Sequence, residues 1–203
     1  MNKERSGGII ALVGAIGSGK STFADRLETE LNAVVFKETI EGNPFMRDAH
    51  KAGALTFQNQ VWFLLQSVER WQKAVEIAEG ATVAIMDTYT PTNLIHSKIT
   101  LDEDSFILYE RLADRLTAHL PPPTVTVYLS DSIDFLMDRL HNKRRLAVDD
   151  EDEPYVARML ALYDEWAKTI ITSSPMLRIR SRDLEDASRA SKYIQEIRAR
   201  IGE

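Results

Sequence analysis

The chain has 203 residues, of which 44% are hydrophobic, and its formal net charge is -6. This length and composition suit one globular domain, and the negative charge argues against a nucleic-acid partner, because phosphate backbones need clustered Lys and Arg. The absence of cysteine excludes disulfides and thiolate metal sites.

The N-terminal part predicts two buried strands around a helix. The continuous apolar run Gly8–Val13 is typical of a strand that is buried on both faces. Residues 21–31 follow with apolar side chains at helical spacing, and Ala33–Phe36 predicts a second strand. The triplet Gly42-Asn43-Pro44 then opens a loop.

The middle of the chain predicts a long helix, a third strand and another helix. Apolar residues recur every three or four positions over 57–78, and Gly80 ends this helix. Thr82–Met86 predicts a third buried strand. A helix over residues 103–120 is ended by the prolines at 121–123.

The C-terminal part repeats this alternation of strands and helices. We expect strands at 125–129 and 177–179, and helices at 133–142, 155–171 and 184–201. Strands separated by helices predict an α/β fold, here a five-stranded parallel sheet with helices on both faces. We expect one domain over residues 1–203.

A phosphate-binding motif lies between the first strand and the first helix. The pattern G-x-x-x-x-G-K-[ST] begins at Gly14, and glycines let several backbone N–H groups point at one anion. Lys20 is predicted to reach the β- and γ-phosphates of a nucleotide, and Ser21 to bind magnesium. We therefore expect ATP or another nucleoside triphosphate, with Mg²⁺, to be bound by Gly14, Ala15, Ile16, Gly17, Ser18, Gly19, Lys20, Ser21 and Thr22.

Four further segments lie in the order found in the deoxyribonucleoside kinase family. They are Lys37-Glu38-Thr39 with Asn43-Pro44-Phe45, then Thr56-Phe57-Gln58, then Asp87-Thr88-Tyr89, and last residues 139–145 with 155–166. With the P-loop, the chain from about residue 8 to 172 resembles this family, especially its bacterial deoxyguanosine and deoxyadenosine kinase branch. The resemblance implies a P-loop kinase fold and transfer of the ATP γ-phosphoryl group to the 5′-hydroxyl of a deoxyribonucleoside.

Two carboxylates are candidates for catalysis and for magnesium binding. Glu38 follows a strand at the sheet edge where open α/β folds bind ligands, and it can accept a proton from a hydroxyl. Taken alone, this position also suits a solvated loop glutamate; the resemblance implies the catalytic base. Asp87 ends a buried strand and can hold magnesium or its waters, or it can cap the next segment.

Four residues are candidates for binding the acceptor. The Gln58 amide can pair with a nucleobase edge, as the resemblance implies, although an exposed helix glutamine is the alternative. His50 falls where the family has a sugar-contacting tyrosine. Trp62 can wall the base or belong to the core, and Asn93 is also assigned to the substrate.

A cationic cluster precedes the acidic run 149–153 and consists of Arg139, Lys143, Arg144 and Arg145. The resemblance implies a lid over about residues 139–153 that closes over the phosphates and excludes water. Arg139 is assigned to the nucleotide, and Lys143 and Arg145 are assigned to catalysis. A solvated, self-paired charged loop is the alternative.

Thr88 stands where the family carries an arginine near its catalytic glutamate. We expect Arg47 or Lys98 to supply the missing charge; the alternative is that both lie on the surface. The same two cations would serve a nucleoside monophosphate kinase similar to the thymidylate kinases. The loss at Thr88 also supports a nucleotide-binding subunit or sensor without transferase activity.

Partners and location follow from the same features. The family is usually dimeric, and the apolar stripe of 57–78 suits a homodimer or an internal core. No apolar run approaches the about 20 residues of a membrane span, and Met1–Gly8 lacks the apolar core of a signal peptide. We expect a cytoplasmic protein without membrane or nucleic-acid partners.

Overall fold

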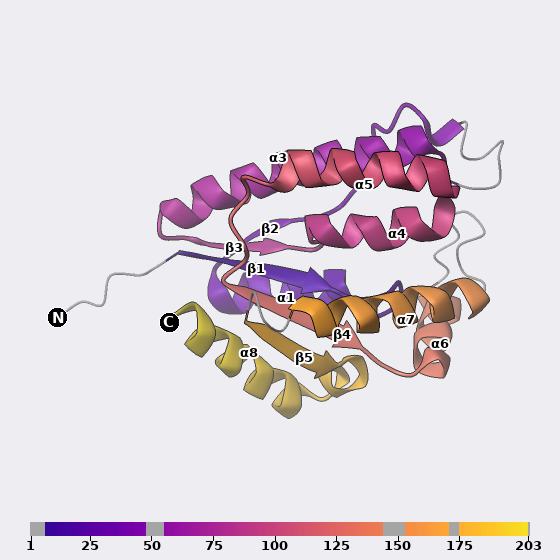
Figure 1. Cartoon of the computed structure of the whole chain (residues 1–203). Coiled ribbons are helices and arrows are strands. Elements are labelled where there is room, and N and C mark those ends of the chain that lie inside the picture. The colour runs from indigo at the N-terminus through magenta and orange to yellow at the C-terminus, as the bar shows by residue number, and fades with distance from the viewer. Residues whose placement is uncertain (1–6, 48–54, 144–152, 171–174, 203) are drawn as a thin grey trace.

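The computed structural model describes residues 7–47, 55–143, 153–170 and 175–202. Over these ranges a five-stranded parallel sheet, in the order β2-β3-β1-β4-β5, is covered by helices on both faces (Figure 1). The predicted α/β fold with a five-stranded parallel sheet is confirmed.

The central strands are buried along their whole length. Every residue of β1 (Gly8–Val13), β3 (Val83–Met86) and β4 (Val125–Ser130) is buried, as expected for apolar runs that are covered on both faces. The sheet edges are β2 (Val34–Phe36) and β5 (Met176–Arg180). Buried and exposed residues alternate in β5, which explains its weaker apolar signal.

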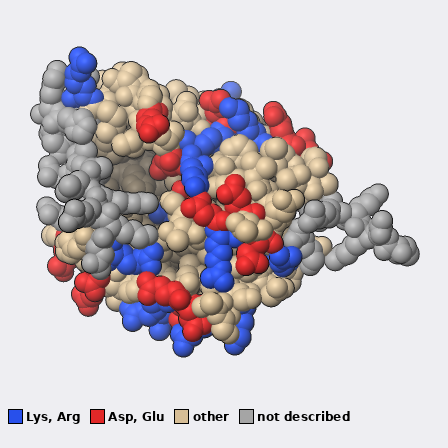
Figure 2. All heavy atoms as spheres, turned by 180° about the vertical axis from the view of Figure 1, so that it is seen from behind, with Lys and Arg blue, Asp and Glu red and all other residues tan. Residues whose placement is uncertain are grey.

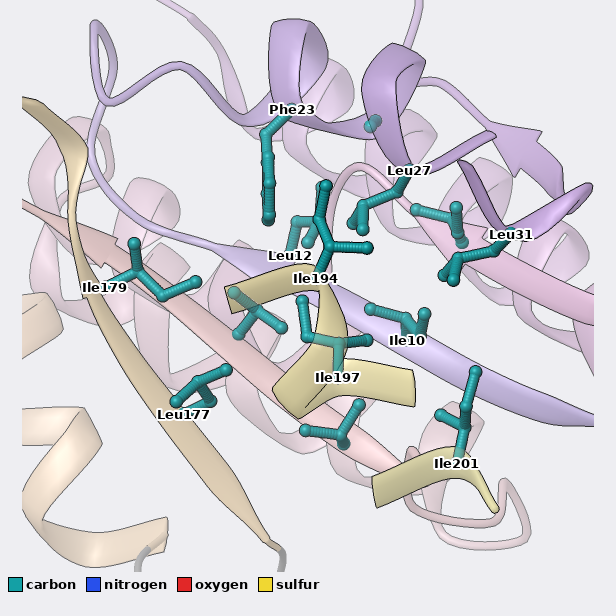
Figure 3. Close-up of a cluster of buried hydrophobic side chains, with 14 of the residues drawn as sticks. Ile10, Leu12, Phe23, Leu27, Leu31, Leu177, Ile179, Ile194, Ile197 and Ile201 are labelled. Carbon is teal, nitrogen blue, oxygen red and sulfur yellow. The ribbon is translucent and has the colours of Figure 1, made fainter. Parts of the chain in front are cut away.

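One face of the sheet is covered by α1 (Lys20–Leu31) and α8 (Ala187–Ile201). Both helices turn side chains at helical spacing toward the strands (Figure 3). Each such fully buried aliphatic side chain contributes roughly 1.5–3 kcal/mol. The shared core includes Ile10, Leu12, Phe23, Leu27, Leu31, Ile194, Ile197 and Ile201.

The opposite face is covered by α3 (Phe57–Glu79), whose Trp71 and Ala74 pack against β1 and β3. The helix α5 (Glu103–Thr117) packs in turn on α3, around the fully buried Tyr109. The long apolar stripe of α3 is therefore mostly internal core, which was one of the two interpretations of its sequence.

Three helices gather at the carboxyl end of the sheet: α4 (Asn93–Thr100), α6 (Ile133–Lys143) and α7 (Glu153–Ile170). Of these helices, α4 was not predicted from the sequence. This helix has only eight residues, follows the short 3-10 turn η1 (Thr90–Thr92), and has no side-chain cap at its start.

The last helix begins later than predicted. The turn η2 (Ser181–Glu185) precedes α8, because the Asp186 side chain accepts a hydrogen bond from the Arg189 N–H at 2.8 Å and caps the helix at Ala187.

The strand order places a crevice between β1 and β3. The chain leaves β1 toward β2 and leaves β3 toward β4, so the connections of these two neighbouring strands run to opposite sides. Open α/β sheets bind ligands beyond the carboxyl ends of the strands at such a point. The P-loop follows β1, and Asp87 follows β3.

The surface and the helices give two further observations. Seen from behind, Lys and Arg side chains are interspersed with Asp and Glu over the described residues (Figure 2). Among the described helices, none combines the length and the apolar character needed to cross a bilayer.

Candidate active site

The P-loop backbone requires glycine at its first position. Gly14 has φ +147°, and a Cβ added there would lie 2.2 Å from the Leu129 carbonyl oxygen. Gly19 caps α1 with φ +93°. The chain therefore turns tightly from β1 into α1 and places the N-terminus of α1, a common binding site for anions, next to the P-loop backbone.

Lys20 is held over this turn. Its Nζ donates to the carbonyl oxygens of Gly14 at 2.7 Å and Ala15 at 3.2 Å. The ammonium group and the N-terminus of α1 thus add positive charge at one end of a cavity.

Ser21 and Asp87 come together from α1 and from the end of β3. Ser21 Oγ donates to Asp87 Oδ2 at 2.8 Å, and the carboxylate is 5% exposed. Asp87 Oδ1 is buried without a hydrogen-bond partner among the described residues. One hydroxyl and one free carboxylate oxygen beside a phosphate-binding loop fit Mg²⁺, which uses one or two carboxylates together with substrate phosphates and water. A cluster of three His, Asp or Glu is absent from the described residues.

A cavity of about 360 Å³ runs from the P-loop to α3, α4 and α7. Its phosphate end is lined by residues of the P-loop and by Arg139, and its far end by apolar and neutral polar groups. The lining comprises Leu12, Ile16, Gly17, Gly19, Lys20, Ser21, Thr22, Glu38, Thr39, Ile40, Leu55, Gln60, Phe63, Asp87, Thr88, Thr92, Asn93, His96, Arg139, Leu140 and Tyr163.

Glu38 lines this cavity just beyond β2. The Glu38 side chain is 37% exposed, yet the surrounding cavity walls desolvate its carboxyl group and raise the pKa. The positive charges of Arg70 and Lys20 partly oppose that rise. A carboxylate with a raised pKa is a stronger proton acceptor. The position therefore suits a general base.

A cation that the sequence analysis missed lies beside Glu38. Arg70 of α3 is 9% exposed, and its Nη2 is 4.0 Å from Glu38 Oε1. Its position could have been noticed, since it falls on the same helical face as the core residues Trp71 and Ala74.

The expectation that Arg47 or Lys98 points into the site needs correction. Both residues are exposed, and the described lining of the cavity includes neither. Lys98 lies two positions after His96 on α4, and two residues along a helix turn a side chain about 200° away. His96 lines the cavity, so Lys98 is directed outward.

The structure places Gln60, not the predicted Gln58, at the cavity. Gln58 is exposed and outside the described lining, whereas Gln60 is 2% exposed and lines the cavity. Thr56 caps the helix in a capping box with Asn59 and thereby fixes where α3 begins. Gln60 Nε2 donates to Thr100 Oγ1 of α4 at 2.9 Å.

The other three residues predicted to bind the acceptor lie in different surroundings. Asn93 is buried in the cavity wall, and its Nδ2 has no hydrogen-bond partner among the described residues. Trp62 is half-buried and outside the described lining; its neighbour Phe63, whose ring it meets edge-on at 5.3 Å between centroids, lines the cavity instead. His50 lies outside the described residues.

His96 and Tyr163 are wall residues that the sequence analysis did not identify. Burial, and to a lesser degree the charge of Lys20, lower the pKa of His96 to about 4. Its Nε2 lies 3.5 Å from the Tyr163 hydroxyl of α7. The neutral ring can thus donate or accept a hydrogen bond at neutral pH. Neither residue had a motif to mark it, because α4 itself was not predicted.

Only part of the predicted lid lies within the described residues. Arg139 of α6 lines the cavity beside Gly19, and its Nη1 donates to Glu185 Oε1 at 2.8 Å. Lys143 ends α6, but its side chain and the whole of Arg145 fall outside the described part. Their roles remain predictions.

Comparisons with known proteins agree on one family. A family model described as deoxynucleoside kinase matches residues 10–201. The chain is 25% identical over 199 residues to a deoxyadenosine/deoxycytidine kinase of Bacillus subtilis (93% of this chain, 91% of that protein), and 24% identical over 177 residues to a deoxyguanosine kinase of the same organism (86% and 85%).

Solved structures support the fold. A deoxyadenosine kinase from M. mycoides with dCMP and dCDP bound aligns with a TM-score of 0.78 at 20% identity, covering 94% of this chain and 99% of that one. The same enzyme with bound dCTP aligns equally well, at 19% identity.

Proposed function

The chain belongs to the deoxynucleoside kinase family, and we propose that it transfers the γ-phosphoryl group of ATP to the 5′-hydroxyl of a deoxyribonucleoside. The observation that carries this proposal is a single cavity that joins the P-loop and Lys20 to the carboxylate of Glu38 and to a neutral polar wall. A phosphate donor, a proton acceptor and an uncharged acceptor molecule can meet there.

The P-loop holds the donor. Its N–H groups and Lys20 bind the β- and γ-phosphates, and Arg139 contributes a second cation at this end of the cavity. Lys143 and Arg145 complete the lid in this proposal.

Ser21 and Asp87 would hold Mg²⁺. The ion, when bound, neutralises charge that develops on the phosphate oxygens. Asp87 Oδ1, which is buried without a hydrogen-bond partner in the described part of the chain, supports this assignment.

Glu38 acts on the acceptor. The 5′-oxygen attacks the γ-phosphorus, the bond from that phosphorus to the β–γ bridging oxygen breaks, and the hydroxyl proton passes to the Glu38 carboxylate. ADP and a deoxynucleoside monophosphate are the products.

The nucleobase occupies the far end of the cavity. Gln60 and Asn93 each carry an amide with both donor and acceptor atoms, as an edge of a nucleobase requires. Phe63 offers an aromatic face, and the neutral pair of His96 and Tyr163 adds uncharged polar groups.

A nucleoside monophosphate kinase fits this cavity less well. Such an enzyme needs cations for the acceptor phosphate, but Lys20 and Arg139, the described lining cations, both lie at the P-loop end. Arg47 and Lys98, which would have filled this need, are exposed. The wall around Gln60 and Asn93 suits an uncharged acceptor instead.

We also propose a homodimer through α3 and α5. Large exposed apolar side chains on these packed helices include Leu65, Ile107 and Leu108, with 47%, 40% and 58% exposure. A second copy of the chain would cover them.

A coupled assay of ADP formation tests the proposed reaction. With ATP and magnesium, deoxynucleosides are expected to support turnover and the matching monophosphates are not. Turnover with monophosphates alone would favour the kinase class that uses them. Tight ATP binding without turnover on either would favour a sensor.

A further inference from the structure

The guanidinium of Arg70 is largely buried, which is unusual for a charged group. The side chain is 10% exposed and comes from the face of α3 that packs on the sheet. Its Nε and Nη2 are buried without hydrogen-bond partners among the described residues. Arginine is almost never buried to this degree unless it is paired, because desolvation of the charge is costly.

The carboxylate in ion-pair range of Arg70, within the described residues, is that of Glu38. The distance of 4.0 Å is the limit of an ion pair, and no hydrogen bond links the two groups. The adjacent Glu69 is exposed and pairs with Lys73 at 2.7 Å. Arg70 therefore faces inward, toward the residue proposed as the base.

Glu38 belongs to the described lining of the cavity, and Arg70 does not. Arg70 can therefore act on the reaction through the carboxylate, without contact to the substrate. Thr88, which does line the cavity next to Asp87, is neutral, and its Oγ1 is buried without a described partner. Among the described residues, positive charge close to Glu38 thus comes from Arg70 of α3 in addition to Lys20 of the P-loop.

We infer that Arg70 is a positioning residue: it holds the Glu38 carboxylate toward the acceptor hydroxyl and supplies the positive charge that Thr88 does not. This inference rests on the proposed role of Glu38 as the base. A guanidinium within ion-pair range of one carboxylate oxygen, here Glu38 Oε1, leaves the other oxygen for the acceptor. Loss of the guanidinium would leave Glu38 free to adopt other rotamers.

The test compares kcat and KM of neutral and charged variants. Arg70→Gln is expected to lower kcat by about 10²-fold, the cost of a misplaced catalytic group, while KM for ATP stays unchanged. Arg70→Lys keeps the charge and is expected to retain a clear part of kcat. Arg70→Met, which buries no new polar group, is made as well so that one folded neutral variant is available. Lys73→Gln, an exposed cation one turn along α3, is the matched control and leaves kcat unchanged.

Two further variants separate this inference from the proposed function. Thr88→Arg is expected to restore kcat in the Arg70→Gln background. In the Glu38→Gln background, Arg70→Gln is expected to cause little additional loss, since the two residues act as one unit.

Three results would overturn the positioning role: native kcat in the folded neutral variants, an equal loss with Lys as with Gln, or an undiminished loss in the Glu38→Gln background. If Glu38→Gln itself keeps native kcat, the proposed base is wrong, whatever Arg70 does. If Glu38→Gln is inactive and Arg70→Gln is not, only the inference fails.

Discussion

Glu38, Asp87 and Lys20 reach the same cavity because of where their elements end. Glu38 and Asp87 follow neighbouring parallel strands, and Lys20 opens the helix that follows the next strand of the sheet. Parallel strands present their carboxyl ends at one edge, so residues far apart in sequence converge there. The sequence could therefore indicate these three positions from the strand pattern together with the motif.

Glu38→Gln tests the base. The amide keeps the size and reach of the carboxylate but cannot accept a proton, so kcat should fall by about 10²–10⁴-fold while ATP affinity is unchanged. The native enzyme should lose kcat as pH falls through the pKa of Glu38, which desolvation by the cavity walls raises above the ordinary glutamate value. An unchanged kcat for the variant across pH would show that Glu38 does not accept the proton.

His96 predicts a pH dependence of stability. Its pKa is about 4 in the folded chain and 6.5 ordinarily, so the unfolded chain binds the proton more tightly between these values. The contribution of neutral His96 is fully present above pH 6.5 and is lost as pH falls toward 4, by up to about 3 kcal/mol.

The measurement is the free energy of unfolding in urea as a function of pH. His96→Gln should flatten the acidic decline by a corresponding amount. A decline of the same steepness in native protein and variant would assign the acid sensitivity to other groups.

At the level of elements, long periodic segments could be predicted and short ones could not. The strand before the P-loop and the helix α3 from Phe57 were predicted correctly, because both carry a clear apolar pattern; the capping box of Thr56 and Asn59 fixes the first residue of α3. The helix α4 was not predicted, because eight residues give too little periodicity. For the same reason His96, which lies on α4, could not be assigned to the cavity wall from the sequence. The helical spacing could mark Arg70 as a buried position, but its pairing with Glu38 could not be predicted, because only the folded chain brings these two elements together.

The orientation of α3, which places Gln60 at the cavity and Gln58 on the exposed side, leads to a paired prediction. Gln60→Leu removes the amide from the cavity wall and should raise KM for the preferred deoxynucleoside, since an unpaired base edge costs about 1–3 kcal/mol. Gln58→Leu, two residues earlier on the exposed side, is the matched control and should leave KM unchanged. KM is measured for each natural deoxynucleoside with the native protein and with both variants, and the comparison decides which glutamine contacts the nucleobase. An effect of Gln58→Leu larger than that of Gln60→Leu would restore the original assignment.

For the whole molecule, the sheet order brings donor and acceptor sites into one crevice, and the outer helices leave an apolar area. The crevice lies between β1 and β3, where the connections run to opposite sides of the sheet. Leu65 of α3 and Ile107 and Leu108 of α5 are exposed on the helical layer that these two helices form. The sequence could predict an apolar stripe on α3 but could not divide it into core and exposed parts, since burial depends on where α5 packs.

The proposed dimer can be tested by sedimentation equilibrium. The native chain should sediment as a dimer, and Leu108→Glu should shift it to monomer, because a charge cannot be buried unpaired in an apolar interface. Val34→Glu, at an exposed apolar position on the edge strand β2, is the control and should leave the dimer intact. A monomeric native chain would remove the proposal.

Identification of the product by mass spectrometry is the direct test of the proposed phosphoryl transfer. After incubation with ATP, magnesium and one deoxynucleoside at a time, we expect equal amounts of ADP and the deoxynucleoside 5′-monophosphate. An analogue without the 5′-hydroxyl should give no product. Lys20→Ala should lower the rate by about 10²–10³-fold through lost transition-state stabilisation. The account is contradicted if no natural deoxynucleoside is phosphorylated by the folded, ATP-binding protein, or if phosphate is transferred to the analogue equally well.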